Sequence, residues 1–210
     1  MAQFKHELTE REYKPEDEAL PTEKSSPSEE SKGSKFRAIV ALWVAFTNTI
    51  SLGPLVVVFS FIPVIGRRIG EWLIWLWAKI FMVFTAQKVE YYGVENIKGR
   101  HAVFMSNHQS YLDSPILYYK LKRIKFIILH KFKNYPLFGW ALWLQGHLFI
   151  HHGRGRLALL TLERAVHKLK RGTSILVFPE GQRQPQLGPF QKGGFRMALR
   201  SGLPILPVAI

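Results

Sequence analysis

An uninterrupted run of 29 uncharged residues, Ala38 to Gly66, limits what this chain can fold into more than any other feature. A helix that crosses a membrane needs about 20 apolar residues, so the run is long enough to span a bilayer. Asn48 and Pro54 interrupt it near the middle, which leaves a kinked or re-entrant element open beside a straight span.

A second apolar run extends from Glu71 to Ala86, which is short for a span, and contains Lys79. Four of the six tryptophans fall between Trp43 and Trp77, and tryptophan favours the headgroup boundary of a bilayer. We therefore expect residues 36–86 to form a membrane-associated segment of two helices, embedded in one leaflet or across the bilayer. The alternative is a helical pair buried inside an unusually apolar soluble domain.

Residues 1–35 are rich in Ser, Pro and Glu and nearly free of large apolar side chains. Such a segment cannot bury enough surface to offset its chain entropy, so we expect a disordered polar tail. A short induced helix over residues 5–13 is the alternative. The tail lacks the ordered charged, apolar and small-residue regions of a secretory signal, which argues against export.

The rest of the chain is strongly basic, since residues 35–210 carry 24 Lys and Arg against six Asp and Glu, a formal net charge of about +18. An anionic membrane surface and nucleic acid are the partners that such a charge suits. Only a membrane also makes use of the uncharged run, so we expect an anionic membrane surface and no nucleic acid. The chain has no cysteine, which excludes disulfides, thiolate metal sites and a cysteine nucleophile.

From residue 87 onward, short apolar runs alternate with longer helical ones. The short runs predict strands, and they read VEYYGV, HAVFMSN, IKFIIL, GHLFI, SILVFP and LPILPVAI. The longer runs predict helices, and they read DSPILYYKLK, YPLFGWALWLQ, GRLALLTLERAVHKLKRG and KGGFRMALRSG. This alternation predicts an α/β domain over residues 87–210, with a mostly parallel central sheet flanked by helices and preceded by the two-helix membrane motif. In such folds the chemistry lies in loops beyond the strand ends.

The strongest chemical signal is the stretch NHQSYLDSP, residues 107–115, between an expected strand and an expected helix. Five residues of a regular helix turn through roughly 500°, so His108 and Asp113 can meet only if the chain bends between them. A carboxylate bonded to one imidazole nitrogen raises the basicity of the other, which can then take a proton from an alcohol. The pair is a candidate general base that works without a protein nucleophile, although an ordinary capped turn would contain the same residues.

A second block, FPEGQR at residues 178–183, also follows an apolar strand. With NHQSYLD and FPEGQR in this order, the chain from about residue 87 resembles the glycerolipid acyltransferase family, which includes the 1-acyl-sn-glycerol-3-phosphate acyltransferases. Two further blocks are similar to the family's: YPLFGW with GHLFIHHGRGR, and LPILPVAI at the terminus. The resemblance implies that the first two blocks face a common cleft.

By this resemblance, the catalytic residues are His108, which deprotonates the free hydroxyl of a lysophospholipid acceptor, and Asp113, which orients it. The hydroxyl then attacks the thioester of acyl-CoA or acyl carrier protein. The favoured acceptor is 1-acylglycerol 3-phosphate, giving phosphatidic acid; glycerol 3-phosphate or a lyso amino-acid lipid such as lyso-ornithine lipid is the alternative. The resemblance also implies substrate-binding roles for Asn107, Arg154, Glu180, Gly181 and Arg183.

We expect no metal and no bound cofactor, because the reaction needs none. His151 and His152 are adjacent and would point to different sides of a strand, so they make a poor ligand pair. They also stand where the family has an acid or amide followed by arginine, which leaves the identity of the phosphate-binding arginine open. We expect a membrane protein on a cytoplasmic face, with the bacterial inner membrane favoured.

A non-catalytic basic lipid-binding protein is the remaining alternative, and such a relative would have lost His108, Asp113 or Glu180. The chain ends at Ile210 inside the last expected strand, which fits either a truncated domain or an unusually short family member.

Overall fold

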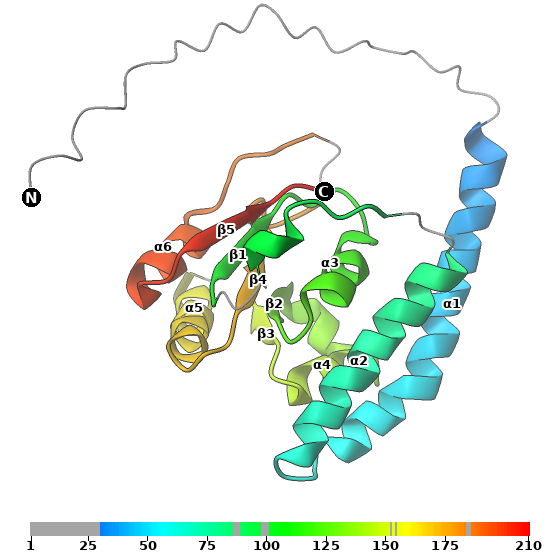
Figure 1. The fold of residues 1–210 in the computed structure, drawn as a ribbon, viewed down its shortest axis with the longest axis horizontal. Coiled ribbons are helices and arrows are strands. Elements are labelled where there is room, and N and C mark those ends of the chain that lie inside the picture. The colour runs from blue at the N-terminus through cyan, green and yellow to red at the C-terminus, as the bar shows by residue number, and fades with distance from the viewer. Residues whose placement is uncertain (1–29, 86–88, 98–100, 152, 154, 184–185) are drawn as a thin grey trace, which may run out of the picture. The chain divides into compact units, whose positions relative to one another are not determined.

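The computed structural model describes residues 30–85, 89–97, 101–151, 153, 155–183 and 186–210. The chain divides into two units, Met1–Phe36 and Arg37–Ile210, and the second unit holds all the described strands. The elements labelled in Figure 1, with two 3-10 helices η1 and η2, are α1 (Glu30–Phe59), α2 (Ile65–Phe84), η1 (Val94–Ile97), β1 (Val103–Ser106), α3 (Asp113–Leu121), β2 (Lys125–Leu129), η2 (His130–Asn134), α4 (Phe138–Leu144), β3 (Leu148–Ile150), α5 (Gly155–Lys170), β4 (Ile175–Val177), α6 (Lys192–Ser201) and β5 (Ile205–Val208).

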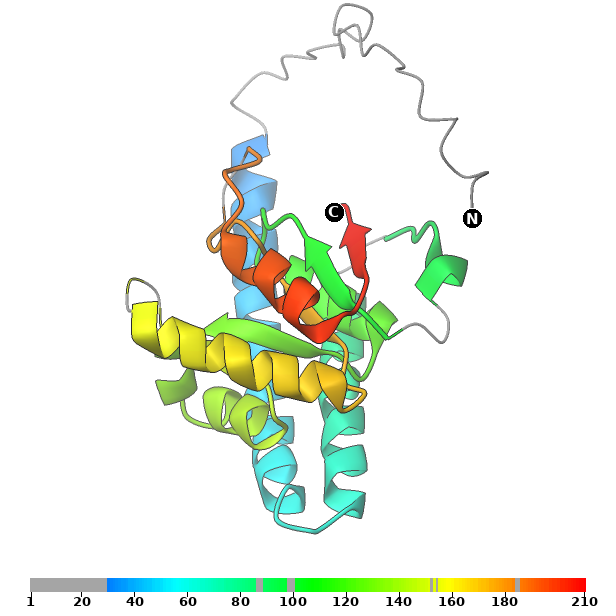
Figure 2. The ribbon, with the colours of Figure 1, turned by 90° about the vertical axis from the view of Figure 1, so that its left-hand side faces the viewer.

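The five described strands form one sheet in the order β3-β2-β4-β1-β5, and every neighbouring pair is parallel. Val103 of β1 pairs with Ile175 of β4 on one side and with Ile205 of β5 on the other. Helices α2 and α3 cover one face of the sheet, and α5 and α6 cover the other (Figures 1 and 2). The predicted parallel α/β fold is confirmed, and all strands present their carboxyl ends at one edge.

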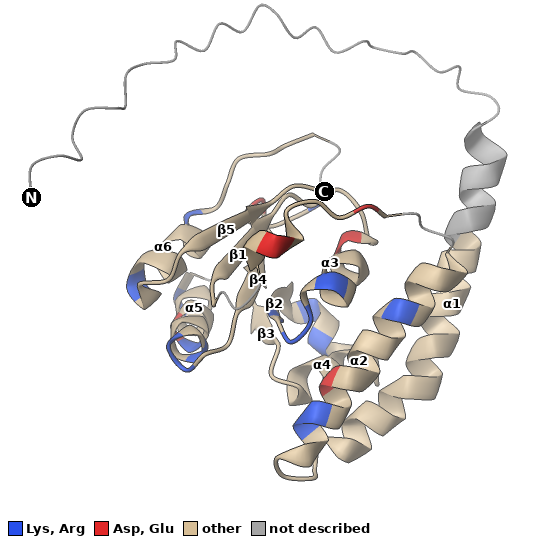
Figure 3. Ribbon diagram, in the orientation of Figure 1, with Lys and Arg blue, Asp and Glu red and all other residues tan. Residues whose placement is uncertain are grey.

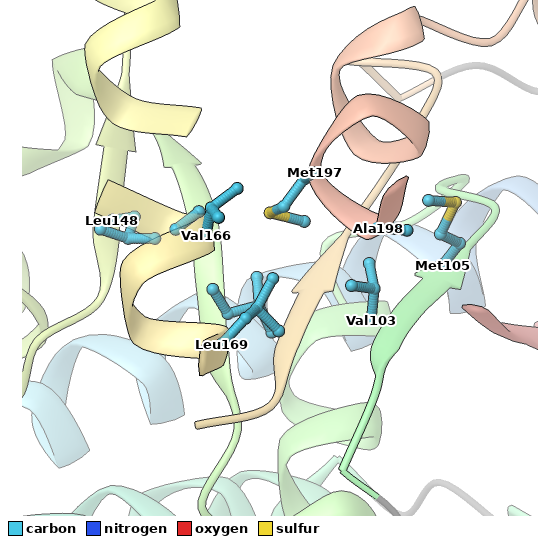
Figure 4. Close-up of a cluster of buried hydrophobic side chains, with 9 residues drawn as sticks. Val103, Met105, Leu148, Val166, Leu169, Met197 and Ala198 are labelled. Carbon is cyan, nitrogen blue, oxygen red and sulfur yellow. The ribbon is translucent and has the colours of Figure 1, made fainter. Parts of the chain in front are cut away.

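Strand β1 is buried along its whole length because helices cover both of its faces. Val103 packs with Leu169 of α5 and Met197 of α6, as Figure 4 shows. Phe104, which points the other way, belongs to a second cluster with Leu117 of α3. A near-continuous apolar run is what a doubly covered parallel strand requires.

The expected strand VEYYGV, residues 89–94, is wrong. Residues 89–92 form no regular structure, Gly93 turns the chain at a φ of 71°, and η1 follows. Val89 and Tyr91 are partly buried while Glu90 and Tyr92 are exposed, as in a strand, but the segment pairs with none of the described strands. The position beside β1 is taken instead by β5.

The N-terminal segment forms two helices, as predicted. The expected tail lies outside the described residues up to position 29. For residues 30–35 the expected disorder is wrong, because α1 begins at Glu30 and continues through Pro54 as one helix. Asn48 does not break it: its side chain is buried and donates a 2.9 Å hydrogen bond from Nδ2 to the backbone oxygen of Trp77 in α2. The second helix begins at Ile65, before the apolar run that predicted it.

Polar contacts join this helical pair to the α/β domain. Lys125, buried at the start of β2, places Nζ 2.8 Å from Oε1 of Glu71 in α2. Nε2 of Gln145 donates a 2.8 Å hydrogen bond to Oγ of Ser60, and this amide lies so close to Gly70 that a β-carbon there would come within 2.0 Å of Nε2. A side chain at position 70 would therefore have to displace the Gln145 amide.

Candidate active site

The active-site candidates lie at the carboxyl edge of the sheet, where β1 and β4 end side by side. Met105 pairs with Val177, so the residues after the two strands emerge next to each other. Asp113 begins α3, and the six residues between β1 and α3 bend back on themselves. As predicted, this bend brings His108 and Asp113 together, with 2.8 Å between Nδ1 and Oδ2.

Asp113 holds the whole turn through one oxygen. Oδ2 accepts the backbone N–H groups of Gln109, at 2.8 Å, and Ser110, at 2.9 Å, in addition to the contact with His108. Oγ of Ser110 accepts the N–H of Leu112 at 3.1 Å, which tightens the turn further. Asp113 is only 3% exposed, so its position is fixed by these donors and not by solvent.

Burial by itself raises the pKa of Asp113, but the hydrogen bonds from His108, Ser110 and Gln109 lower it, and the net pKa lies below the ordinary value of 3.8. The carboxylate is therefore ionised at neutral pH. An ionised carboxylate can only accept hydrogen bonds, so Nδ1 of His108 carries the ring hydrogen. Nε2 has no hydrogen-bond partner among the residues that the structure describes.

His108 is also held on its ring face and on its backbone. The ring of Phe178 stacks on the imidazole, with centroids 3.8 Å apart and planes 13° from parallel. Glu180, 3% exposed, accepts the N–H of His108 with Oε1 at 2.8 Å and the N–H of Gly188 with Oε2 at 2.9 Å. Both oxygens of Glu180 are thus bound to backbone, and its predicted substrate-binding role stays a prediction.

Gly181 and Arg183 lie on the loop after β4. Gly181 has a φ of 75°, a left-handed conformation that favours glycine, and its N–H bonds to the backbone oxygen of Phe178 at 3.0 Å. The guanidinium carbon of Arg183 lies 3.3 Å from the ring centre of Tyr111, which belongs to the turn between His108 and Asp113. The loop therefore brings Arg183 to the same turn as His108.

The side chain of Asn107 continues the pairing of β1 with β5. Its Nδ2 donates to the backbone oxygen of Ile210, and its Oδ1 accepts the N–H of the same residue, both at 2.8 Å. Arg154, also predicted to bind substrate, lies outside the described residues, as does His152. His151 stacks on His130 at the ends of β3 and β2, with centroids 3.7 Å apart.

A further histidine, His147, is not part of this edge. It precedes β3 and accepts the N–H of Phe126 at Nδ1, 3.1 Å away, beside the start of β2. Complete burial, with Lys125 and Lys168 nearby, keeps the pKa of His147 well below its ordinary value, so the ring is neutral. Within the described part of the chain, no group of three His, Asp or Glu side chains could hold a metal ion.

Residues 88–210 match the family model described as Acyltransferase. The chain belongs to the acyltransferase family. A chloroplastic 1-acyl-sn-glycerol-3-phosphate acyltransferase of Brassica napus is 32% identical over 148 residues, which cover 69% of this chain and 43% of the relative. A 1-acyl-sn-glycerol-3-phosphate acyltransferase of Pseudomonas aeruginosa is 35% identical over 130 residues, covering 60% and 51%. The chain thus spans about half the length of these curated relatives.

The fold of the chain is similar to that of the 1-acyl-sn-glycerophosphate acyltransferase PlsC of Thermotoga maritima. The TM-score is 0.69 at 27% sequence identity, over 83% of this chain and 73% of the other. The resemblance inferred from the two motif blocks is confirmed.

Two aromatic residues of the candidate site were not predicted from the sequence: Phe178, which stacks on His108, and Tyr111, which stacks on Arg183. Both lie inside the motif blocks. Parallel pairing of the strands before the blocks would have placed Phe178 beside the turn, but no spacing rule indicates that Tyr111 meets an arginine 72 residues later.

Proposed function

We propose that the protein is a membrane-bound O-acyltransferase that moves an acyl chain from acyl-CoA or acyl carrier protein to the free hydroxyl of a lysophospholipid. The observation that carries the proposal is the imidazole of His108, oriented through Nδ1 by an ionised Asp113 and with no hydrogen-bond partner at Nε2 among the described residues. Such a group is a general base for an alcohol.

In the proposed reaction, Nε2 of His108 removes the hydroxyl proton while the oxygen attacks the thioester carbonyl carbon. The new C–O bond forms a tetrahedral intermediate, which collapses as the C–S bond breaks. The imidazolium returns its proton to the departing thiolate, so the enzyme ends unchanged. Asp113 stabilises the imidazolium formed in between. The thioester is a co-substrate, and these steps call on neither a metal nor a bound cofactor.

For the acceptor we propose 1-acylglycerol 3-phosphate, which gives phosphatidic acid. The names of the curated relatives support this choice, as does an arginine at the site whose donor fork suits phosphate oxygens. Glycerol 3-phosphate and a lyso amino-acid lipid remain alternatives, and incubation with each acceptor and a labelled acyl donor separates them. A non-catalytic lipid-binding role is disfavoured because the His108–Asp113 pair is intact.

Membrane binding is proposed for α1 and α2. The segment Ile39–Phe59 is long and apolar enough to cross a membrane, by length and composition alone, and only 22% of its most apolar stretch is buried. Leu42, Trp43 and Phe46 are each more than 60% exposed, and Figure 3 shows no charged residue on the coloured part of α1. A soluble protein rarely leaves so large an apolar surface uncovered.

An anionic bilayer, with the basic domain against its surface, is the proposed partner. The relatives come from a chloroplast as well as from bacteria, so a bacterial inner membrane stays a prediction.

Acyl transfer by a His108→Ala variant tests the catalytic proposal. We expect the rate with 1-acylglycerol 3-phosphate to fall at least about a hundredfold, since general-base catalysis contributes roughly 10²–10⁴-fold. Thermal unfolding and flotation with anionic vesicles should show a folded, membrane-bound protein. His167→Ala, which removes an exposed histidine of α5, is the matched control. Full activity of His108→Ala would refute the proposal.

A further inference from the structure

The pairing of Tyr111 with Arg183 suggests how the acceptor headgroup is held. Tyr111 is 73% exposed, yet one face of its ring lies 3.3 Å from the guanidinium carbon of Arg183. Among the described residues, the guanidinium makes no hydrogen bond or ion pair. When a guanidinium stacks on an aromatic ring, its N–H groups lie in the guanidinium plane, parallel to the ring. They point outward from the stacked pair, where a ligand can accept them.

The loop that carries Arg183 is fixed at its base but not at this side chain. The N–H of Gln191 bonds to the backbone oxygen of Pro179 at 2.7 Å, and Glu180 holds Gly188. These contacts fix where the loop begins and ends. The long arginine side chain would still sample many rotamers, so the ring of Tyr111 is the contact that fixes its guanidinium.

The position of this pair beside the base selects the acceptor phosphate over the phosphates of the donor. Tyr111 lies in the same turn as His108, three residues later. In 1-acylglycerol 3-phosphate only four covalent bonds separate the reacting oxygen from phosphorus. In acyl-CoA, the whole pantetheine arm separates the thioester from the nearest phosphate. A cation held at the turn that carries the general base is therefore better placed for the first phosphate than for the second.

We propose that Tyr111 is a positioning residue that holds the guanidinium of Arg183 ready to bind the phosphate monoester of the acceptor. This inference rests on the proposed function. The ring of Tyr111 restricts the Arg183 side chain before phosphate binds, so the side chain loses less conformational entropy on binding. Loss of the ring should therefore weaken acceptor binding more than it slows the chemical step.

The test is the initial rate of acyl transfer from labelled acyl-CoA to 1-acylglycerol 3-phosphate, measured for Tyr111→Ala, Tyr111→Phe, Arg183→Ala and the Tyr111→Ala/Arg183→Ala double variant. We expect Tyr111→Ala to raise the acceptor KM about threefold to tenfold, the range of a partly exposed cation–π contact, with a smaller effect on kcat and none on the donor KM. Tyr111→Phe, which keeps the ring, should restore the wild-type KM. Tyr92→Ala removes another exposed tyrosine and should behave like the wild type.

In the Arg183→Ala background, Tyr111→Ala should have no further effect, because the ring acts only through the arginine. An equal effect in both backgrounds, an unchanged acceptor KM, or a raised donor KM instead would each overturn the inference and leave the proposed function standing. If the unmutated protein transfers no acyl group to the acceptor, the proposed function fails and the inference fails with it.

Discussion

Replacing Glu180 with glutamine separates two roles for this carboxylate, holding the backbone of His108 or binding the acceptor. Its two oxygens accept the N–H groups of His108 and Gly188 at 2.8 and 2.9 Å, and the residue is 3% exposed. Glutamine has one oxygen and one NH₂ group. Whichever way the amide turns, one buried backbone N–H faces another donor.

The size of the effect follows from these two bonds. A hydrogen bond to a charged group contributes about 1.5–3 kcal/mol, and a buried donor left without a partner costs about 1–3 kcal/mol. We expect Glu180→Gln to lower the free energy of unfolding by roughly 2–4 kcal/mol. For a chain of this length, that corresponds to a fall in Tm on the order of 10 °C.

The assay is thermal unfolding of the purified protein without substrate, followed by kcat and the acceptor KM. If Glu180 holds His108, Tm falls before any substrate is present, and kcat falls because the base is misplaced. The opposite pattern, an unchanged Tm with a raised acceptor KM, would refute this reasoning and assign the residue to the acceptor. Glu163→Gln, 53% exposed and 3.7 Å from Arg200, is the matched control and should change stability by less than about 0.5 kcal/mol.

Two other sites give sharp expectations. Because three donors meet one oxygen of Asp113, the carbonyl of Asp113→Asn can still accept them. Its Tm should fall only slightly, by the contribution of the lost charge, while kcat falls roughly 10–100-fold; Asp113→Ala, which removes the acceptor itself, should lower Tm further. The pKa of Asp113 is lower in the folded chain than its ordinary 3.8. The carboxylate therefore stabilises the fold above about pH 4, and this contribution is lost as the pH falls through the folded-state pKa. Thermal unfolding of the wild type and Asp113→Asn at decreasing pH measures the contribution. Gly70→Ala should displace Gln145 from Ser60 and destabilise the fold by about 1–3 kcal/mol in thermal unfolding, whereas Gly193→Ala, with 3.4 Å to Leu162, should be neutral or stabilising.

The sequence predicted those parts of the site that depend on local geometry and on strand order. His108 and Asp113 are five residues apart at the mouth of a strand, and the gap itself requires the turn that the structure contains. The role of Glu180 could not be found in this way, because a side chain that bonds to a backbone N–H 72 residues away leaves no pattern in the sequence.

The fold shows the same limit. The VEYYGV segment has the composition of a strand, but β5 occupies the sheet position beside β1. Whether a segment of this composition joins the sheet depends on its tertiary contacts and not on its composition alone. The Glu71–Lys125 contact likewise joins residues 54 positions apart. Neither the β1–β5 pairing nor this contact could be predicted from the sequence, since long-range pairing depends on which surfaces meet after the local elements have formed.

The two carboxylates of the site, Asp113 and Glu180, contact different parts of His108. Asp113 acts on the ring, where it fixes the tautomer, and Glu180 acts on the backbone from which the ring extends. With Phe178 against the ring face, His108 is fixed in position, rotation and tautomer before any substrate arrives. A general base must be oriented and still be reachable, and the side chain of His108 keeps 14% of its surface exposed. These constraints come from two strands that are neighbours only because the sheet is parallel, so the catalytic geometry depends on the pairing of β1 with β4 as much as on the motif residues themselves.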